Sequence, residues 1–283
     1  MTLSASYVVF DGLETLEGSI KSIRESVDLV LVSYQTVSWG GTKASSDLIP
    51  TLQELKRKGL VDEIMEFTKF VPSSLVRPEE VMQAKSFETV KRQSLLERSL
   101  GLGATHYLSM DADEFYIKSQ FDLAKKTIED DKLHATAVSY INYLTPTLHQ
   151  GYSKFRVPFI YSIGQNSKHS SSQLMFGGVD PTRGIYDESY SRSKIFGKEE
   201  ITMHHMEMVR NDLKHKYDAS SRYFSNRRGI PQLVDDIELS KKTGILKFNG
   251  LHFGDTKPGN KEDKVLTECE DLFGLMTDRN GLG

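Results

Sequence analysis

The stretch HYLSMDADEFY, residues 106–116, places a short apolar run directly before a cluster of carboxylates. The run up to Met110 has the composition of a buried β-strand, and Asp111, Asp113 and Glu114 follow it at once. A strand that ends in three negative charges needs a partner that balances them. Solvent, a basic group or a divalent metal could each serve, so the rest of the chain decides what these carboxylates do.

The residues before this stretch alternate between strand and helix patterns. Three further apolar segments read as strands: YVVF (7–10), DLVLVSY (28–34) and VDEIMEF (61–67). A helical pattern follows each of them, and Pro78 opens the longest one, because proline suits the first turn of a helix. Parallel strands need crossover connections of this kind. The sequence therefore predicts an α/β fold with a Rossmann-like, mainly parallel sheet flanked by helices.

The second half of the chain has a different pattern. Apolar and aromatic residues crowd into extended segments between His134 and Ile163, and short strands and a helix around 209–224 are expected after them. The regular alternation ends near residue 130. We therefore expect one continuous domain, with a nucleotide-binding half at 1–130 and a smaller mixed, substrate-facing half at 131–283 that share one sheet.

Composition bounds the class of protein. Of the 283 residues, 38% are hydrophobic and 27% charged, as in ordinary globular proteins, and the net charge of -3 argues against a general nucleic-acid binder. The single cysteine, Cys269, excludes an intrachain disulfide and fits a reducing compartment. With no apolar run of about 20 residues and no signal pattern, the sequence predicts a cytoplasmic protein, in the host cytoplasm if it is viral. No obligate protein partner is evident.

The position of the carboxylates favours a metal site. In open α/β sheets ligands bind beyond the carboxyl ends of the strands, and Asp111 and Asp113 lie there. Two aspartates at positions i and i+2 can direct both side chains to one point, and hard oxygen ligands suit Mg²⁺ or Mn²⁺. The competing interpretation is a solvated acidic turn. If no metal binds, the two charges repel, and we expect at least one carboxyl group to keep its proton.

The segment THYLSMDADEF resembles the D-x-D segment of glycosyltransferases with the GT-A fold. The resemblance implies that Asp111 and Asp113 bind a divalent metal on the diphosphate of a sugar nucleotide. The preceding VKRQSLLERSLGLGATHYL is similar to the family-2 pattern of a basic residue, a helix and the metal strand, which would put Arg92 near the nucleotide. The first strand ends in Asp11, which resembles the nucleoside-binding start of that fold.

A second, distant segment supports the same family. GLHFGDTKPGN, residues 250–260, resembles the H-F-x-G-x-x-K-P-W ending of glycogenin-like and lipooligosaccharide galactosyltransferases, although Gly254 falls one place early and a glycine replaces the aromatic residue. The resemblance implies that His252 is a third metal ligand and that Gly254 and Lys257 hold the diphosphate. The competing interpretation is a turn in which His252 packs or caps.

Together these features predict a metal-dependent glycosyltransferase that uses a UDP-sugar and a hydroxyl acceptor. The 250–260 segment favours a retaining reaction, in which the leaving phosphate assists the acceptor. The DADEF segment instead resembles the inverting family, whose reaction would need a carboxylate base such as Glu188 or Glu207. The alternatives are a metal-dependent nucleotidyl- or phosphotransferase and a non-catalytic binding module. Release of free UDP from a UDP-sugar would favour the glycosyltransferase over both.

Two further groups of residues remain open. His204 and His205 are adjacent in MHHMEM, so on a strand at most one of them faces the site, where it could replace His252 as the metal ligand. The segment RYFSNRR contains three arginines, Arg222, Arg227 and Arg228, which form a basic group together with Lys214 and Lys216. This group is either a solvated helix face or a contact for a polyanionic acceptor, such as lipopolysaccharide or a modified DNA base.

Overall fold

The computed structural model describes residues 1–39, 41–68, 78–170, 172–180, 182–219, 230–246 and 265–275, with the side chains of 78–85 left out. Its elements run in the order β1 (Leu3–Val9), α1 (Leu13–Ile23), η1 (Arg24–Ser26), β2 (Leu29–Tyr34), α2 (Leu48–Arg57), β3 (Glu63–Glu66), α3 (Pro78–Gly101), β4 (His106–Asp111), β5 (Glu114–Tyr116), α4 (Lys118–Asp130), β6 (Ala135–Thr145), β7 (Leu148–Ser162), β8 (Lys168–His169), β9 (Ile185–Tyr186), β10 (Ser193–Ile195), β11 (Thr202–His205), α5 (Leu213–Ala219), α6 (Ile230–Thr243) and β12 (Thr267–Glu268).

One large sheet organises the described part of the chain. Its strands lie in the order β3-β2-β1-β4-β7-β6-β11-β5, and β10 and β12 pair with β6 and β7. The four strands from β3 to β4 in this order are parallel to one another. β7 is antiparallel to both of its neighbours, β4 and β6, whereas β11 is parallel to β6. The predicted fold class, an α/β fold with a mainly parallel sheet flanked by helices, is confirmed. This sheet contains strands from before and after residue 130.

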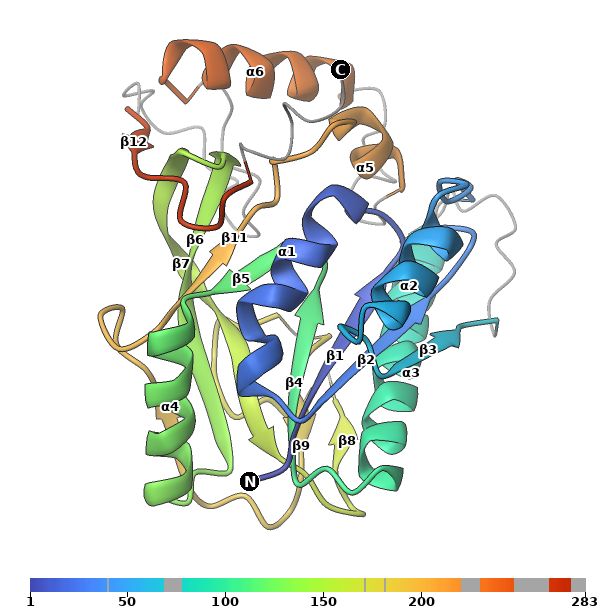
Figure 1. Ribbon diagram of the computed structural model, residues 1–283, viewed down its shortest axis with the longest axis vertical. Coiled ribbons are helices and arrows are strands. Elements are labelled where there is room, and N and C mark those ends of the chain that lie inside the picture. Colours follow the sequence, from blue (N-terminus) through green and yellow to red (C-terminus); the bar gives the residue numbers. More distant parts are fainter. Residues whose placement is uncertain are drawn as a thin grey trace.

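Helices cover both faces of this sheet because alternate strand residues are apolar on each side. Val30 and Val32 of β2 pack in one core with residues of α1, α2 and α4, whereas Leu31 between them packs in a second core with Leu95 and Leu96 of α3. A strand that is buried on both faces reads as a continuous apolar run, which is the pattern of LVLVSY. Figure 1 shows α1 and α2 in front of the sheet and α3 behind it.

The carboxyl ends of the parallel strands meet at one edge of the sheet. α5 and α6 lie above this edge in Figure 1, and they contact each other. Their apolar residues, including Leu213, Tyr217 and Ile237, form a separate small core with Leu144 and Leu148 from β6 and β7. No helix in the described ranges is long and apolar enough to span a membrane.

The boundaries differ from the expected ones in two places. The first strand was expected at 7–10 but is β1, residues 3–9. It starts earlier because Ser4 and Ser6 are buried, and both hydroxyls hydrogen-bond to Ser99 of α3. These serines gave no apolar signal in the sequence. The helix expected around 209–224 begins at Leu213 as α5, whose described part ends at Ala219.

Candidate functional site

The candidate site lies at the carboxyl edge of β1, β2 and β4. Register pairs Val8 of β1 with Asp111 of β4, and Val9 with Tyr34 of β2, so these three strands end side by side. The residues that follow β1 and β2 include Asp11 and Gln35. This is the edge at which open α/β sheets bind their ligands.

Asp111 lies between two buried arginines. Its Oδ1 accepts a hydrogen bond from Nη2 of Arg92 at 2.9 Å, and its Oδ2 accepts one from Nη2 of Arg183. Arg183 also contacts Glu114, with Nη1 2.7 Å from Oε1, and its Nε lies 3.3 Å from Asp180. The side chain of Asp111 is 33% exposed, whereas those of both arginines are 5% exposed or less. Solvent therefore reaches Asp111 far more readily than its arginine partners.

Asp113 is buried and has different partners. Its Oδ2 contacts Arg210 and lies 2.9 Å from Nζ of Lys216, and its Oδ1 lies 3.5 Å from Nε2 of His205. The side chain is 5% exposed. Asp111 and Asp113 therefore face separate groups of basic side chains in this structure.

The expectation that an aspartate keeps its proton when no metal is bound is wrong. Burial raises the pKa of Asp111, but Arg183 and Arg92 outweigh this effect and lower it. Burial also raises the pKa of Asp113, and Lys216, Arg210 and His205 together hold it well below its usual range. In the described structure these arginines and Lys216 balance the charges of the two aspartates. Glu114 differs, because burial raises its pKa and Arg183 only partly opposes this.

The two adjacent histidines point to opposite faces of β11, as predicted for a strand. His205 faces Asp113, and its Nδ1 lies 2.9 Å from Oδ1 of Asn142. His204 faces away, where its Nδ1 lies 2.8 Å from the hydroxyl of Tyr143, and burial lowers its pKa to about 4. Of the two candidate ligands, only His205 lies at the carboxylates.

A second basic pair comes from the buried face of α3. Arg92 is 3% exposed and contacts Ser109, Glu88 and Asp111, while its neighbour Lys91 is 2% exposed. The ammonium group of Lys91 donates long hydrogen bonds to the carbonyl of Val9 (3.4 Å) and to Oε1 of Gln35 (3.3 Å). Burial lowers the pKa of Lys91 to about 8. This amine lies directly below the ends of β1 and β2.

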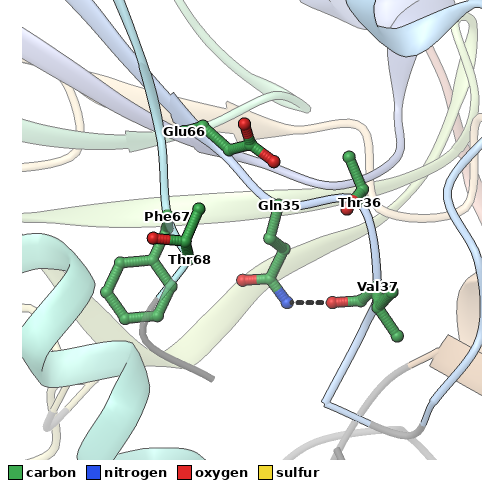
Figure 2. Close-up of a pocket in the computed structure, with 6 residues that line it drawn as sticks. All are labelled: Gln35, Thr36, Val37, Glu66, Phe67 and Thr68. Atoms are coloured by element: carbon green, nitrogen blue, oxygen red, sulfur yellow. Dashed lines mark hydrogen bonds between the residues drawn. The ribbon is translucent and has the colours of Figure 1, made fainter. Parts of the chain in front are cut away.

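A hollow of about 190 Å³ opens beside Gln35, where β2 and β3 end. Figure 2 shows its two walls, which are residues 35–37 and residues 66–68. Gln35 is held in place, because its Nε2 donates to the carbonyl of Val37 at 2.9 Å and its Oε1 accepts from Lys91. Trp39 packs edge-on against the ring of Phe67, with centroids 6.1 Å apart. The hollow thus has an aromatic wall and a fixed amide next to the carboxylate site.

Of the remaining candidate residues, some lie near the carboxylates and others do not. Asp11 lies 4.0 Å from Nη2 of Arg210, at the same edge as Asp113. Glu207 is half-buried, and its carbonyl accepts a hydrogen bond from Lys216, whereas Glu188 is exposed. Lys216 was expected in a basic surface patch but is turned inward to Asp113. Six residues lie outside the described residues: His252, Gly254, Lys257, Arg222, Arg227 and Arg228.

Three basic residues of the site were missed in the sequence: Arg183, Arg210 and Lys91. Lys91 and Arg92 precede Leu95 and Leu96 by one helical turn, and this spacing places them on the buried face of α3. The spacing was therefore a usable signal. Arg183 and Arg210 lie in irregular segments, and nothing in their local pattern indicates that they meet carboxylates 72 and 97 residues away.

Gly12 is predicted to be essential for the position of Arg210. It adopts φ +78° at the start of α1, and an added Cβ would lie 1.9 Å from Nη1 of Arg210. Gly12→Ala is expected to cost roughly 1–2 kcal/mol of unfolding free energy for the left-handed backbone, plus about 1–3 kcal/mol because the guanidinium must leave Asp113. Gly103→Ala is the matched control for urea denaturation, since Gly103 has φ +85° and open space around it. Equal losses in the two variants would show that Arg210 does not depend on Gly12.

Comparison with known proteins gives distant similarities only. No family model and no curated protein matches the chain. Among solved structures it is similar to S. aureus TarS 1–349, at 8% identity and a TM-score of 0.42 over 86% of this chain and 74% of that chain. A complex of the same TarS fragment with UDP-GlcNAc gives 10% identity and a TM-score of 0.36 over 86% and 75%. CMP:2-keto-3-deoxy-manno-octonic acid synthetase with CTP gives 11% and 0.32 over 58% and 72%. Similarity this distant carries no information about activity.

Proposed function

We propose that this protein is a glycosyltransferase that moves a sugar from a nucleoside diphosphate, most simply UDP, to a hydroxyl group of an acceptor. The observation that carries the proposal is the position of the Asp111-x-Asp113 turn. It lies at the carboxyl edge of a mainly parallel sheet, the same edge at which the hollow opens at the ends of β2 and β3. The resemblance of this segment to the D-x-D segment of GT-A glycosyltransferases supports the same activity.

In this proposal the donor nucleoside would occupy the hollow beside Gln35. Phe67 supplies an apolar wall, and the carboxylate of Glu66 and the hydroxyl groups of Thr36 and Thr68 supply polar groups that can bind a base or ribose. Asp11, at the end of the neighbouring strand, would bind the ribose or base from the other side. The diphosphate would then extend from the hollow toward Asp111, and Arg92 would contribute positive charge on the way.

A divalent ion, Mn²⁺ or Mg²⁺, is part of the proposal. Asp111 and Asp113 are donors of the right chemical type, and Asp111 is open enough for an ion to reach it. Within the described ranges no group of three His, Cys, Asp or Glu side chains is arranged to hold an ion, so His252, which lies outside them, would have to complete the set, or His205 would have to move to do so. When bound, the ion would neutralise charge on the leaving diphosphate.

The protein's own groups would act on the leaving group and the acceptor. Arg92 and Lys257 would stabilise the diphosphate as its negative charge develops, and Gly254 would let the backbone approach it. A retaining reaction remains our preference, because the leaving phosphate can itself accept the acceptor's proton. If the reaction inverts, Glu207 is better placed than Glu188 to act as the base, since its backbone carbonyl accepts a hydrogen bond from Lys216, which contacts Asp113.

The acceptor would lie on the side of the second half of the chain. A glycan, a lipopolysaccharide or a modified DNA base would each offer a hydroxyl group. Arg222, Arg227 and Arg228 would contact the acceptor if it is a polyanion.

A thermal-shift screen of nucleotide sugars with and without Mn²⁺ tests the proposal. At 100 times its dissociation constant, a ligand adds about 2.7 kcal/mol of stability, which corresponds to a melting shift of roughly 5 °C or more. We expect a UDP-sugar to give this shift with Mn²⁺, and Asp111→Asn to remove its metal-dependent part. Asp130→Asn, a substitution in an exposed ion pair with Lys126, is the control.

The same screen separates the candidate ligands and reactions. His252→Ala should remove the metal-dependent shift, and if it does not, His205 becomes the better third ligand. Free UDP released from a UDP-sugar supports sugar transfer, whereas cleavage between the α- and β-phosphates would establish a phosphotransferase instead. Absence of any nucleotide-dependent shift would contradict the proposed function.

A further inference from the structure

Arg210 reaches the N-terminal end of α1 from the segment after β11. An added Cβ on Gly12, the residue that caps this helix, would lie 1.9 Å from Nη1, 2.8 Å from Cζ and 3.0 Å from Nη2 of Arg210. The guanidinium group therefore lies against Gly12 at the start of the helix, with Nη1 nearest. The backbone of Gly12 has φ +78° here, which glycine adopts without strain.

Part of this guanidinium group has no hydrogen-bond acceptor. Arg210 is 8% exposed, and Nη2 contacts Asp113. Within the described part of the chain, Nε and Nη1 of Arg210 are buried without a hydrogen-bond partner. The carboxylates of Asp11 and Glu14 form ion pairs with Arg210 at 4.0 and 3.8 Å, but these distances are too long for hydrogen bonds. A buried charged donor without an acceptor is costly, so these N–H groups indicate an absent anionic ligand.

The first backbone N–H groups of α1 also need hydrogen-bond acceptors. This helix has eleven residues and no side-chain cap in the described structure, so its first backbone N–H groups have no side-chain acceptor. The helix dipole places partial positive charge at this end, which favours an anion, and Glu14 in the first turn supplies one carboxylate near it. Lys216, 2.9 Å from Asp113, adds a further positive charge beside it. One anion would satisfy the helix end and Arg210 together.

We propose that Arg210 and the first turn of α1 form a phosphate-binding site that takes the diphosphate of the donor. The inference rests on the proposed function for the identity of the ligand but not for its chemical class. The site lies at the carboxyl edge between Asp11 and Asp113, so a nucleotide whose base occupies the hollow beside Gln35 extends its phosphates toward it. Arg210 is then a substrate-binding residue in addition to a partner of Asp113.

Calorimetric titration of the full chain with inorganic pyrophosphate in EDTA tests the site directly. Arg210→Gln is expected to weaken pyrophosphate binding roughly 10- to 100-fold, the loss of one or two charge-assisted hydrogen bonds. Arg210→Lys should fall between the wild type and Arg210→Gln, because lysine keeps the charge but not the forked geometry. Arg98→Gln is the matched control: Arg98 is 45% exposed and pairs with Glu63 at the opposite edge of the sheet.

The outcomes separate this site from the proposed function. Wild-type protein that does not bind pyrophosphate at millimolar concentration, or Arg210→Gln that binds it within twofold of wild type, overturns the site. If pyrophosphate binding depends on Arg210 but no nucleotide sugar binds, the site stands and the glycosyltransferase proposal fails. Near-ultraviolet circular dichroism confirms folding of each variant, and Arg210→Lys carries the test if Arg210→Gln does not fold.

Discussion

Asp113→Ala is expected to lower the free energy of unfolding by about 3–5 kcal/mol at neutral pH, because it removes one partner from a buried ion pair. Arg210 would keep its charge in the buried position over Gly12 without a carboxylate within hydrogen-bond distance. Lys216 is less affected, since it also donates to the carbonyl of Glu207 at 2.8 Å. Urea denaturation of wild type and variant measures the difference.

The effect of Asp113→Ala should depend on acidity. Arg210 and Lys216 hold the pKa of Asp113 well below its usual range, so its contribution to stability is present above the pKa of the unfolded chain, about 3.9. The contribution is lost as the pH falls below that value, so the difference between wild type and variant should shrink there. Asp130→Ala, in an exposed pair with Lys126, should cost at most about 0.5 kcal/mol at any pH. A loss below 1 kcal/mol for Asp113→Ala would contradict the buried pairing.

Arg183→Met is expected to cost a similar 3–5 kcal/mol at pH 7.5, because Arg183 contacts three carboxylates at once. Glu114 is the most affected of them, since it is 1% exposed and Arg183 is its cationic partner in the described ion pairs. Asp111 keeps Arg92 as a second partner at 2.9 Å. The methionine retains the apolar packing of the arginine stem, so the loss reports mainly on charge.

The effect of Arg183→Met should also shrink as the pH falls, but in a higher pH range than the effect of Asp113→Ala. Burial already raises the pKa of Glu114, and without Arg183 this pKa rises further. A raised carboxyl pKa contributes stability at low pH that is lost as the pH rises through it, so the variant should be closer to wild type at pH 5 than at pH 7.5. Arg57→Met, in an exposed pair with Glu54, is the control. An equal loss at both pH values would show that Glu114 does not take up the proton.

The two predictions follow from one property of the site. Its acidic side chains are not balanced by solvent or by neighbours in sequence, but by Arg92, Arg183, Arg210 and Lys216 from three other segments. A nucleotide with a metal ion would bring both negative and positive charge into this arrangement. Ligand binding is therefore expected to change the pairing of Asp111 before that of the more deeply buried Asp113.

Local patterns predicted most of the fold. The strand before Asp111 and the helix that starts at Pro78 lie where expected, since continuous apolar runs and helical spacing depend only on neighbouring residues. The start of β1 was missed, because Ser4 and Ser6 are buried by bonding to Ser99 and not by being apolar. The orientation of His204 and His205 to opposite faces was also predictable, as it follows from strand geometry.

The sequence by itself determined the α/β class and the place of Asp111 and Asp113 at the carboxyl edge, because periodicity and strand-end position are local properties of the chain. Only the tertiary structure decided what neutralises them. Arg183 and Arg210 reach the carboxylates across 72 and 97 residues, from segments without a regular pattern. Such pairs are fixed by how the sheet and loops pack, and a Coulomb interaction in a buried site depends on distance in space and not on distance along the chain.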